Sequence, residues 1–283
     1  MLGFIVREIL HCNLFSKETL PIEEIDLPIR VDDKISPPRC EVQKWPMMDP
    51  HRIVQYLVNN AGLVLPLEEV AKFWQTSRAN REPWALGTEA GDHHIPLGIY
   101  GDSATLVTKY GLRTSVAAIF ISLPLWRPAS LRLSRFMIAA VPDNKMWYHH
   151  TLLQLYRRIV WSLNALFDNQ HPTVGPAGEP LPEHLRAVGG TPITTNNSVF
   201  VVTEVRGDWS WHKKVLRYEA NWNAKKVCFK CDARSDGRWS KRYYNFDDAE
   251  WIGRSFNTVQ FLSHMMPSVG VSPSEQFEVV HIS

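Results

Sequence analysis

The spacing of apolar residues predicts two helices before residue 95. In "MMDPHRIVQYLVNNAG" Asp49 is suited to the N-cap and Pro50 to the first helical position, and an apolar face follows. "PLEEVAKFWQTSRAN" has its apolar residues on one side of a second helix. Residues 1–46 carry several prolines, which disfavour a continuous helix or a central strand. We therefore expect an irregular N-terminal segment.

After residue 95 the pattern changes to that of strands. "IPLGIYGD" and its continuation "ATLV" are followed by a turn near residues 109–111 and by the strongly apolar "SVAAIFISL". "LRLSRFMIAAVP", closed by Pro142, predicts a third strand. Short connections favour an antiparallel meander of these three strands.

A long amphipathic helix and a fourth strand come next. The helix is indicated by apolar residues that recur three or four positions apart, namely Tyr148, Leu152, Leu155, Ile159, Leu163 and Leu166. We expect Arg157 and Arg158 to lie on its solvated face. A Pro/Gly-rich loop follows, and "NSVFVVTEVRGD" is the fourth strand. A helix between the third and fourth strands lets the fourth lie parallel to the first and beside it.

These elements predict a mixed α+β fold with four parts. We expect an irregular segment at 1–46, a helical lead-in at 47–94, the mixed-sheet core at 95–222, and a C-terminal part at 223–283. The last part contains a C-x-x-C knuckle, a basic segment and a helix.

The candidate chemistry begins with two aspartates. The first and fourth strands both end on Gly-Asp, at Asp102 and Asp208, and parallel neighbours would present both acids at one edge of the sheet. Paired carboxylates can hold two divalent metals about 4 Å apart, and Mg²⁺ suits such oxygen ligands. The alternative is that Gly-Asp is ordinary turn chemistry at strand ends.

Cys228 and Cys231, in "VCFKCDA", provide half of the four ligands that a Zn²⁺ site normally needs. His212 and His264 are candidates for the other ligands, although their spacing matches no standard pattern. Free structural thiols or a redox pair are the alternatives.

A basic segment interleaved with aromatic residues is the best local candidate for contacts with a nucleic-acid backbone. Its members are Lys225, Lys226, Lys230, Arg234, Arg238, Trp239, Lys241 and Arg242. A solvated basic loop is the alternative.

Composition narrows the class of protein only moderately. The 283 residues are 45% hydrophobic and 21% charged, with a net charge of +2, which by itself favours neither a nucleic acid nor a membrane as partner. No apolar run approaches the length of a membrane span, and no signal-peptide pattern is present. Four cysteines, two of them in C-x-x-C, are typical of a reducing compartment, so we expect a nuclear or cytoplasmic protein. The sequence contains no P-loop, dinucleotide glycine motif, G-x-S-x-G or H-E-x-x-H.

The chain resembles open reading frames derived from DDE-type, CACTA-like transposases. The resemblance is carried by three stretches, "PLGIYGDSATL", "VTEVRGDWSWHKKVL" and "VCFKCDA". The resemblance covers roughly residues 50 to 235 and implies an RNase H-like core. It also implies that Asp102 and Asp208 are the first two acids of a triad for metal-dependent cleavage or strand transfer of DNA.

The third acid of such a triad is usually a glutamate on a helix beyond the knuckle, and Glu250 is the only acid that we would propose. The chain ends soon after Glu250, where the family would be expected to continue. This departure makes a degenerate, inactive derivative the alternative to an active enzyme. A non-catalytic nucleic-acid-binding or interaction protein with a zinc knuckle on the same scaffold is the alternative function.

Overall fold

The computed structural model describes residues 22–32, 37–82, 85–86, 93–107, 113–126, 134–208, 211–212, 225, 227–228 and 234–235. The chain divides into two compact units. One contains residues up to Arg206 together with Ile282 and Ser283, and the other extends from Gly207 to His281. Each unit is described by itself.

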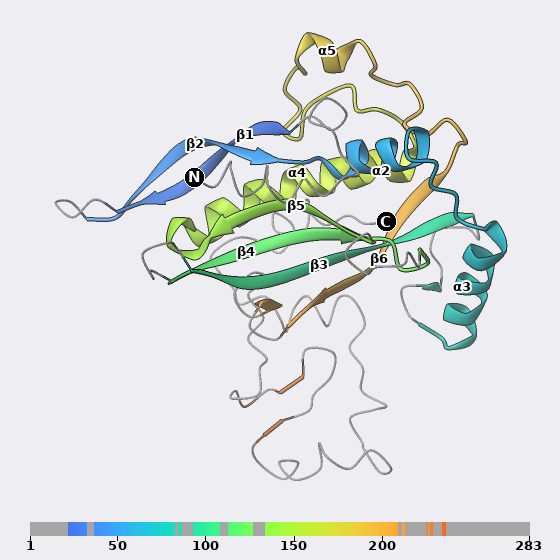
Figure 1. The fold of residues 1–283 in the computed structure, drawn as a ribbon, viewed down its shortest axis with the longest axis horizontal. Coiled ribbons are helices and arrows are strands. Elements are labelled where there is room, and N and C mark those ends of the chain that lie inside the picture. Colours follow the sequence, from blue (N-terminus) through green and yellow to red (C-terminus); the bar gives the residue numbers. More distant parts are fainter. Residues whose placement is uncertain are drawn as a thin grey trace. The chain divides into compact units, whose positions relative to one another are not determined.

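Figure 1 shows the elements that the described residues form. In chain order they are β1 (Glu23–Val31), β2 (Arg39–Met47), α2 (Pro50–Asn59), α3 (Leu67–Ala79), β3 (His94–Val107), β4 (Arg113–Ser122), β5 (Arg135–Pro142), the 3₁₀-helix η3 (Asp143–Lys145), α4 (Tyr148–Asp168), α5 (Glu183–Arg186) and β6 (Val199–Gly207).

The central sheet has four strands in the order β5-β4-β3-β6. The pairs β3–β4 and β4–β5 are antiparallel, and β6 is the parallel strand beside β3. The connection from β5 to β6 contains α4, and such a crossover lets the two neighbours run in the same direction. The prediction of a mixed α+β protein with a mixed sheet is confirmed.

Strand β3 is longer than the Gly-Asp ending suggested. It pairs with β4 continuously from Gly98, opposite Ser122, to Val107, opposite Arg113. Asp102 therefore lies within the strand, opposite Ala118, and the prediction that it ends the strand is wrong. The physical reason is that the backbone beyond Asp102 still finds hydrogen-bond partners in β4, so a glycine and an acid do not stop the ladder.

The N-terminal segment is not irregular throughout, as the prolines had suggested. β1 and β2 form an antiparallel ribbon in which Pro28 pairs with Val42 and Pro46 with Glu24. Each strand of a two-stranded ribbon has an open side, where a proline without an N–H is tolerated. The indole Nε1 of Trp45 donates a hydrogen bond of 3.0 Å to the carbonyl of Ala140, which links the ribbon to β5.

Helices α2, α3 and α4 lie where the apolar spacing predicted them, whereas the helix expected within 223–283 lies outside the described residues. The predicted apolar face of α4 is buried at Leu152, Leu155, Ile159, Leu163 and Leu166. Figure 1 shows α4 running alongside the central sheet. None of the helices among the described residues is long and apolar enough to cross a membrane.

The Pro/Gly-rich loop between α4 and β6 has a defined course. Isolated bridges join Val174 to Pro180 and Gln170 to Pro192. Asn59, at the end of α2, donates to the carbonyl of Ile193 over 2.9 Å and so ties the loop to the helical lead-in. The loop therefore folds back on itself through these two bridges and is tied to α2 near its end.

Candidate functional site

One face of the central sheet carries polar side chains beside a buried apolar cluster that includes Ala118 and Met137. Alternation along β3 places Gly98, Tyr100 and Asp102 on the same face, and their partners in β4 are Ser122, Phe120 and Ala118. We define the polar face by five side chains, those of Tyr100, Asp102, Ser122, Arg135 and Glu204. All five belong to the first unit.

The Asp102 carboxylate is half-buried and held at both oxygens. Oδ1 accepts the backbone N–H of Ser103 over 2.7 Å, and Oδ2 accepts the hydroxyl of Tyr100 over 3.1 Å. A carboxylate oxygen can accept more than one hydrogen bond or ligand bond, so each oxygen keeps a free position. This oriented oxygen donor fits a hard divalent cation such as Mg²⁺. Asp102 alone does not complete a site, because the described residues contain no group of three metal-ligating side chains.

Tyr100 is enclosed by its neighbours on the same face. The guanidinium carbon of Arg135 lies 4.3 Å from the centre of the Tyr100 ring, and the Phe120 ring is 5.8 Å away. Burial raises the pKa of Tyr100 and the hydrogen bond and charge of Asp102 raise it further, whereas Arg135 lowers it. The phenol therefore stays protonated at neutral pH and can donate to Asp102.

Glu204 of β6 lies against Gly98 of β3. A Cβ atom at Gly98 would be 2.6 Å from Ser122 Oγ and 2.7 Å from Glu204 Oε1, so this close approach requires glycine. Glu204 Oε2 pairs with Arg206 over 2.7 Å, while Oε1 is buried and has no hydrogen-bond partner among the described residues. The sequence analysis did not select Glu204. The sequence spacing could have pointed to this contact, since Gly98 and Glu204 each lie four residues before one of the predicted aspartates.

Asp208 belongs to the second unit, where it begins a short helical turn. Its Oδ1 accepts the backbone N–H of Trp211 over 2.6 Å, and its carbonyl accepts that of His212 over 3.0 Å. These are the contacts of an N-cap, and they agree with the turn interpretation of this Gly-Asp pair. The pKa of His212 is lowered by burial, against the raising effects of the Gly207 carbonyl and the Asp208 charge.

Two described residues that flank the C-x-x-C stretch in the sequence are joined by a hydrogen bond. The backbone N–H of Ser235 donates to the carbonyl of Lys225 over 2.8 Å. Cys228 is half-buried. Lys225 and Arg234, the described members of the basic segment, are exposed. The remaining predicted site residues lie outside the described residues, namely Lys226, Lys230, Cys231, Arg238, Trp239, Lys241, Arg242, Glu250 and His264.

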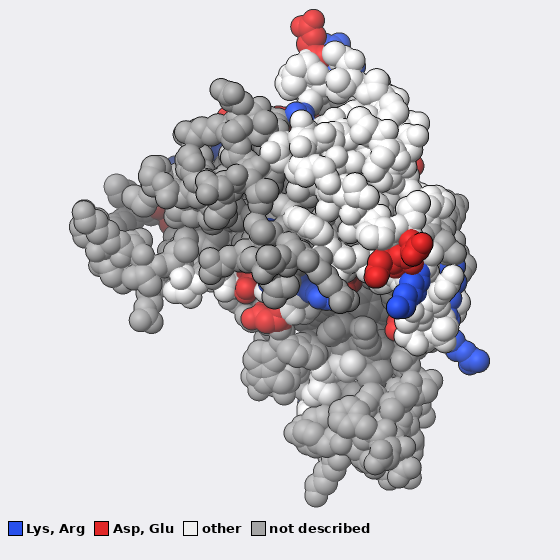
Figure 2. Space-filling view, turned by 45° about the vertical axis from the view of Figure 1, so that its right-hand side comes forward, with Lys and Arg blue, Asp and Glu red and all other residues white. Residues whose placement is uncertain are grey.

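Charged groups are sparse on the face that Figure 2 shows. On its described residues, the Lys, Arg, Asp and Glu side chains form small, separate groups of both signs around a wide uncharged area. The described residues of this face therefore present no continuous basic surface.

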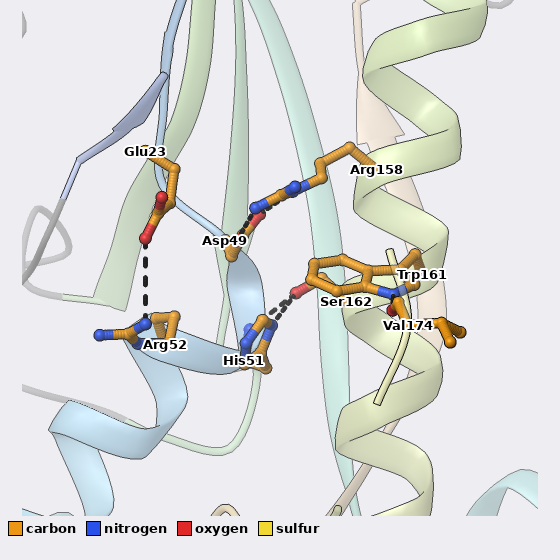
Figure 3. Close-up of polar contacts among 8 residues, drawn as sticks. All are labelled: Glu23, Asp49, His51, Arg52, Arg158, Trp161, Ser162 and Val174. Atoms are coloured by element: carbon orange, nitrogen blue, oxygen red, sulfur yellow. Dashed lines mark hydrogen bonds and ion pairs between the residues drawn. The ribbon is translucent and has the colours of Figure 1, made fainter. Parts of the chain in front are cut away.

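A second polar cluster lies between α2 and α4 (Figure 3). Arg158 donates to both carboxylate oxygens of Asp49, over 2.7 and 2.6 Å, and Asp49 is only 2% exposed. Asp49 precedes α2 as predicted, but its side chain makes no capping hydrogen bond. The prediction that Arg158 is solvated is wrong, because its guanidinium neutralises this buried carboxylate.

The same cluster contains a serine and a histidine in contact. Ser162 Oγ lies 2.9 Å from the backbone nitrogen of His51 and 2.8 Å from its Nδ1 (Figure 3). Ser162 is completely buried, and the nearby Asp49 binds Arg158. A serine nucleophile needs access to substrate and a base oriented by a third group. We therefore assign these residues to joining α2 and α4.

The described residues thus show Asp102 as a carboxylate oriented by two hydrogen bonds and Asp208 as a helix cap. They add Tyr100, Arg135 and Glu204, which the sequence analysis had not selected. No protein-family model, curated protein or solved structure matches this chain.

Proposed function

We propose that this protein has an RNase H-like core of the DDE-transposase type and cleaves or transfers DNA phosphodiesters with the help of Mg²⁺. In this proposal Asp102 and Asp208 are the first two metal ligands and Glu250 is the third acid. The observation that carries the proposal is the alignment of β6 with β3.

Two contacts define that alignment within the first unit. Thr203 Oγ1 lies 3.4 Å from the carbonyl of Leu97, and these residues are 106 positions apart in the chain. Glu204 and Gly98 have the same separation. Parallel strands advance by nearly the same rise per residue, so an alignment is kept along the pair. Asp208 and Asp102 have the same separation in the sequence, and we propose that both acids serve one site.

Bound Mg²⁺ would activate a water or hydroxyl and stabilise the leaving oxygen in such a reaction. The chain would supply the oxygen ligands, and Asp102 is already oriented by Tyr100 and the Ser103 amide. The exposed Lys225 and Arg234 support a role for the basic segment in contacts with DNA phosphates. As part of the same proposal, we place the protein in the nucleus or cytoplasm, where its thiols would stay reduced.

Cleavage of DNA by the purified chain in the presence of Mg²⁺ or Mn²⁺ tests this proposal. Asp102→Asn and Asp208→Asn should each lower the rate by more than about 100-fold, beyond the loss expected for an outer-shell partner. Asp26→Asn is the matched control, because Asp26 is exposed and pairs across the ribbon with Lys44. A cleavage rate in Asp102→Asn equal to that of the wild type would contradict the proposal.

A non-catalytic nucleic-acid-binding protein with a zinc knuckle is the second candidate. It is favoured by the capping role of Asp208. Asn retains a capping oxygen and Ala does not. If Asp208 serves only as a cap, Asp208→Asn should keep every activity of the wild type, while Asp208→Ala should cost about 1 kcal/mol of stability. If Asp208 binds metal, Asp208→Asn should lose metal binding while keeping that stability.

A further inference from the structure

We propose that His171 is a pH-sensitive switch that holds the loop of residues 170–192 against α2 as a neutral imidazole and releases this loop when it is protonated. The inference is independent of the proposed function, because none of the residues that carry it belongs to the polar face. It assigns a conformational response to the cluster between α2 and α4, which has so far only joined the two helices.

Two hydrogen-bonding contacts hold the body of the loop to these helices. His171 Nε2 lies 3.1 Å from Nε2 of Gln55 on α2. The carbonyl of Val174 accepts the indole N–H of Trp161 on α4 over 2.8 Å (Figure 3). Leu181 is the one buried hydrophobic side chain of the loop. A segment with so few buried contacts can open while the rest of the unit stays folded.

The backbone of His171 also joins the two arms of the loop. Its N–H donates to the carbonyl of Thr191, and its carbonyl accepts the N–H of Gly190, both over 2.8 Å. A change at the imidazole therefore acts on both arms together.

The side chains around His171 fit a neutral imidazole better than a cation. The Gln55 amide nitrogen is a donor that suits an unprotonated Nε2, and a protonated Nε2 would direct its hydrogen at this donor. The His51 ring lies edge-on, with 5.9 Å between the ring centres. Burial and then the charge of Arg52 lower the pKa of His171.

The acids of this region already act on arginines. Arg158 donates two hydrogen bonds to Asp49, and Arg52 lies 3.9 Å from Glu23 of β1. Glu179, an exposed acid of the loop, acts on Arg158 as well. A positive charge on the imidazole would therefore meet no unpaired carboxylate among the described residues of this cluster. Protonation should favour the open loop, in which water surrounds the ring.

The direction of the pH effect follows from the lowered pKa. In the open loop the pKa of His171 returns to its ordinary value of 6.5. Below this pH the open form binds more protons than the closed form, so opening becomes more favourable as the pH falls. One histidine can raise the opening constant by up to about tenfold per pH unit.

Hydrogen–deuterium exchange of the full chain at pH 7.5 and pH 5.5, corrected for the intrinsic pH dependence of exchange, tests the switch. The protection of the loop amides should be about three- to tenfold lower at pH 5.5 in the wild type. His171→Gln should give equal protection at both pH values, because it places a neutral amide near the position of Nε2. His184→Gln is the matched control, since His184 is an exposed histidine in the same loop, and it should keep the wild-type response.

Low concentrations of urea distinguish release of the loop from unfolding of the whole unit. Local opening exposes little surface, so exchange of the loop amides at pH 5.5 should not change with urea below the unfolding transition. Exchange of the paired amides of β3 and β4 should rise with urea. Loop exchange that rises in parallel with that of β3 and β4 would overturn the switch. A pH response that is absent from the wild type, or that persists in His171→Gln, would overturn it as well.

Discussion

The carboxylate of Asp49 and the guanidinium of Arg158 face each other through two hydrogen bonds, one from Nε over 2.7 Å and one from Nη2 over 2.6 Å. Asp49 lies directly before α2 and Arg158 lies in the middle of α4, so this pair joins two helices that are far apart in the sequence. Arg158 also covers the Trp161 ring, with its guanidinium carbon 4.5 Å from the ring centre.

Arg158→Met should lower the free energy of unfolding by about 3–5 kcal/mol, because it leaves the buried Asp49 carboxylate without a counter-charge. Urea denaturation measures the loss. Adding Asp49→Asn to Arg158→Met should recover part of the stability by removing that charge. Lys44→Met, which breaks the exposed pair with Asp26, is the control and should cost about 1 kcal/mol or less. Equal losses of unfolding free energy in Arg158→Met and Lys44→Met would contradict the inference that Arg158 neutralises a buried carboxylate.

Acidification should destabilise the first unit through His51 and His171. Burial, followed by the charges of His171, Arg52 and Arg158, lowers the pKa of His51 well below its ordinary value of 6.5. Burial and Arg52 lower the pKa of His171 as well. Below about pH 6.5 the unfolded chain therefore binds more protons than the folded chain, and stability falls as the pH decreases.

The expected slope is at most about 1.4 kcal/mol per pH unit for each histidine, and it should vanish above their unfolded pKa. Urea denaturation between pH 5 and pH 8 measures it. His51→Asn should make the curve flatter, although it also lowers the overall stability. His184→Asn replaces an exposed histidine of α5 and should leave the slope unchanged. The same slope in His51→Asn and the wild type would exclude His51 as the source.

Gly98→Ala should lower stability by about 1–3 kcal/mol, because the new methyl group would overlap Glu204 and Ser122. Glu204→Ala in the same chain should restore part of the loss, since it clears the space beside residue 98. A double-mutant cycle monitored by urea denaturation should show a coupling of about 1 kcal/mol. Additive effects of the two substitutions would show that Glu204 does not lie against Gly98, and would remove the support for the alignment of β6 with β3.

The purified protein should contain one Zn²⁺ per chain if the C-x-x-C stretch of Cys228 and Cys231 belongs to a zinc knuckle. Metal analysis should find that Cys228→Ser loses this zinc, because it removes a thiolate ligand. Cys40→Ser is the matched control, since Cys40 is an exposed free thiol on β2 and should not affect the metal content. If zinc persists in Cys228→Ser, or if the wild type contains none, the zinc-knuckle hypothesis is wrong. Cys228 and Cys231 would then be structural thiols.

Apolar spacing was sufficient to predict an element where that element has a regular pattern of buried residues within one segment. The apolar spacing of α4 identified the residues of its buried face, and the helix between two strands led to the parallel pairing of β6 with β3. Prolines were misleading in the β1–β2 ribbon, because a proline excludes a central strand but not a strand with an open side. The Gly-Asp pair was misleading in β3, since pairing with β4 continued beyond it.

The sequence by itself determined the helices α2, α3 and α4, the four strands of the central sheet and the mixed nature of that sheet, because these depend on residue spacing within each segment and on the order of the segments. Only the tertiary structure decided which side chains meet. Asp49 binds Arg158 and does not cap α2, Tyr100 donates to Asp102, and Glu204 lies on Gly98. Each of these contacts depends on a strand register or on helix packing, and those are set by the burial of many distant residues together.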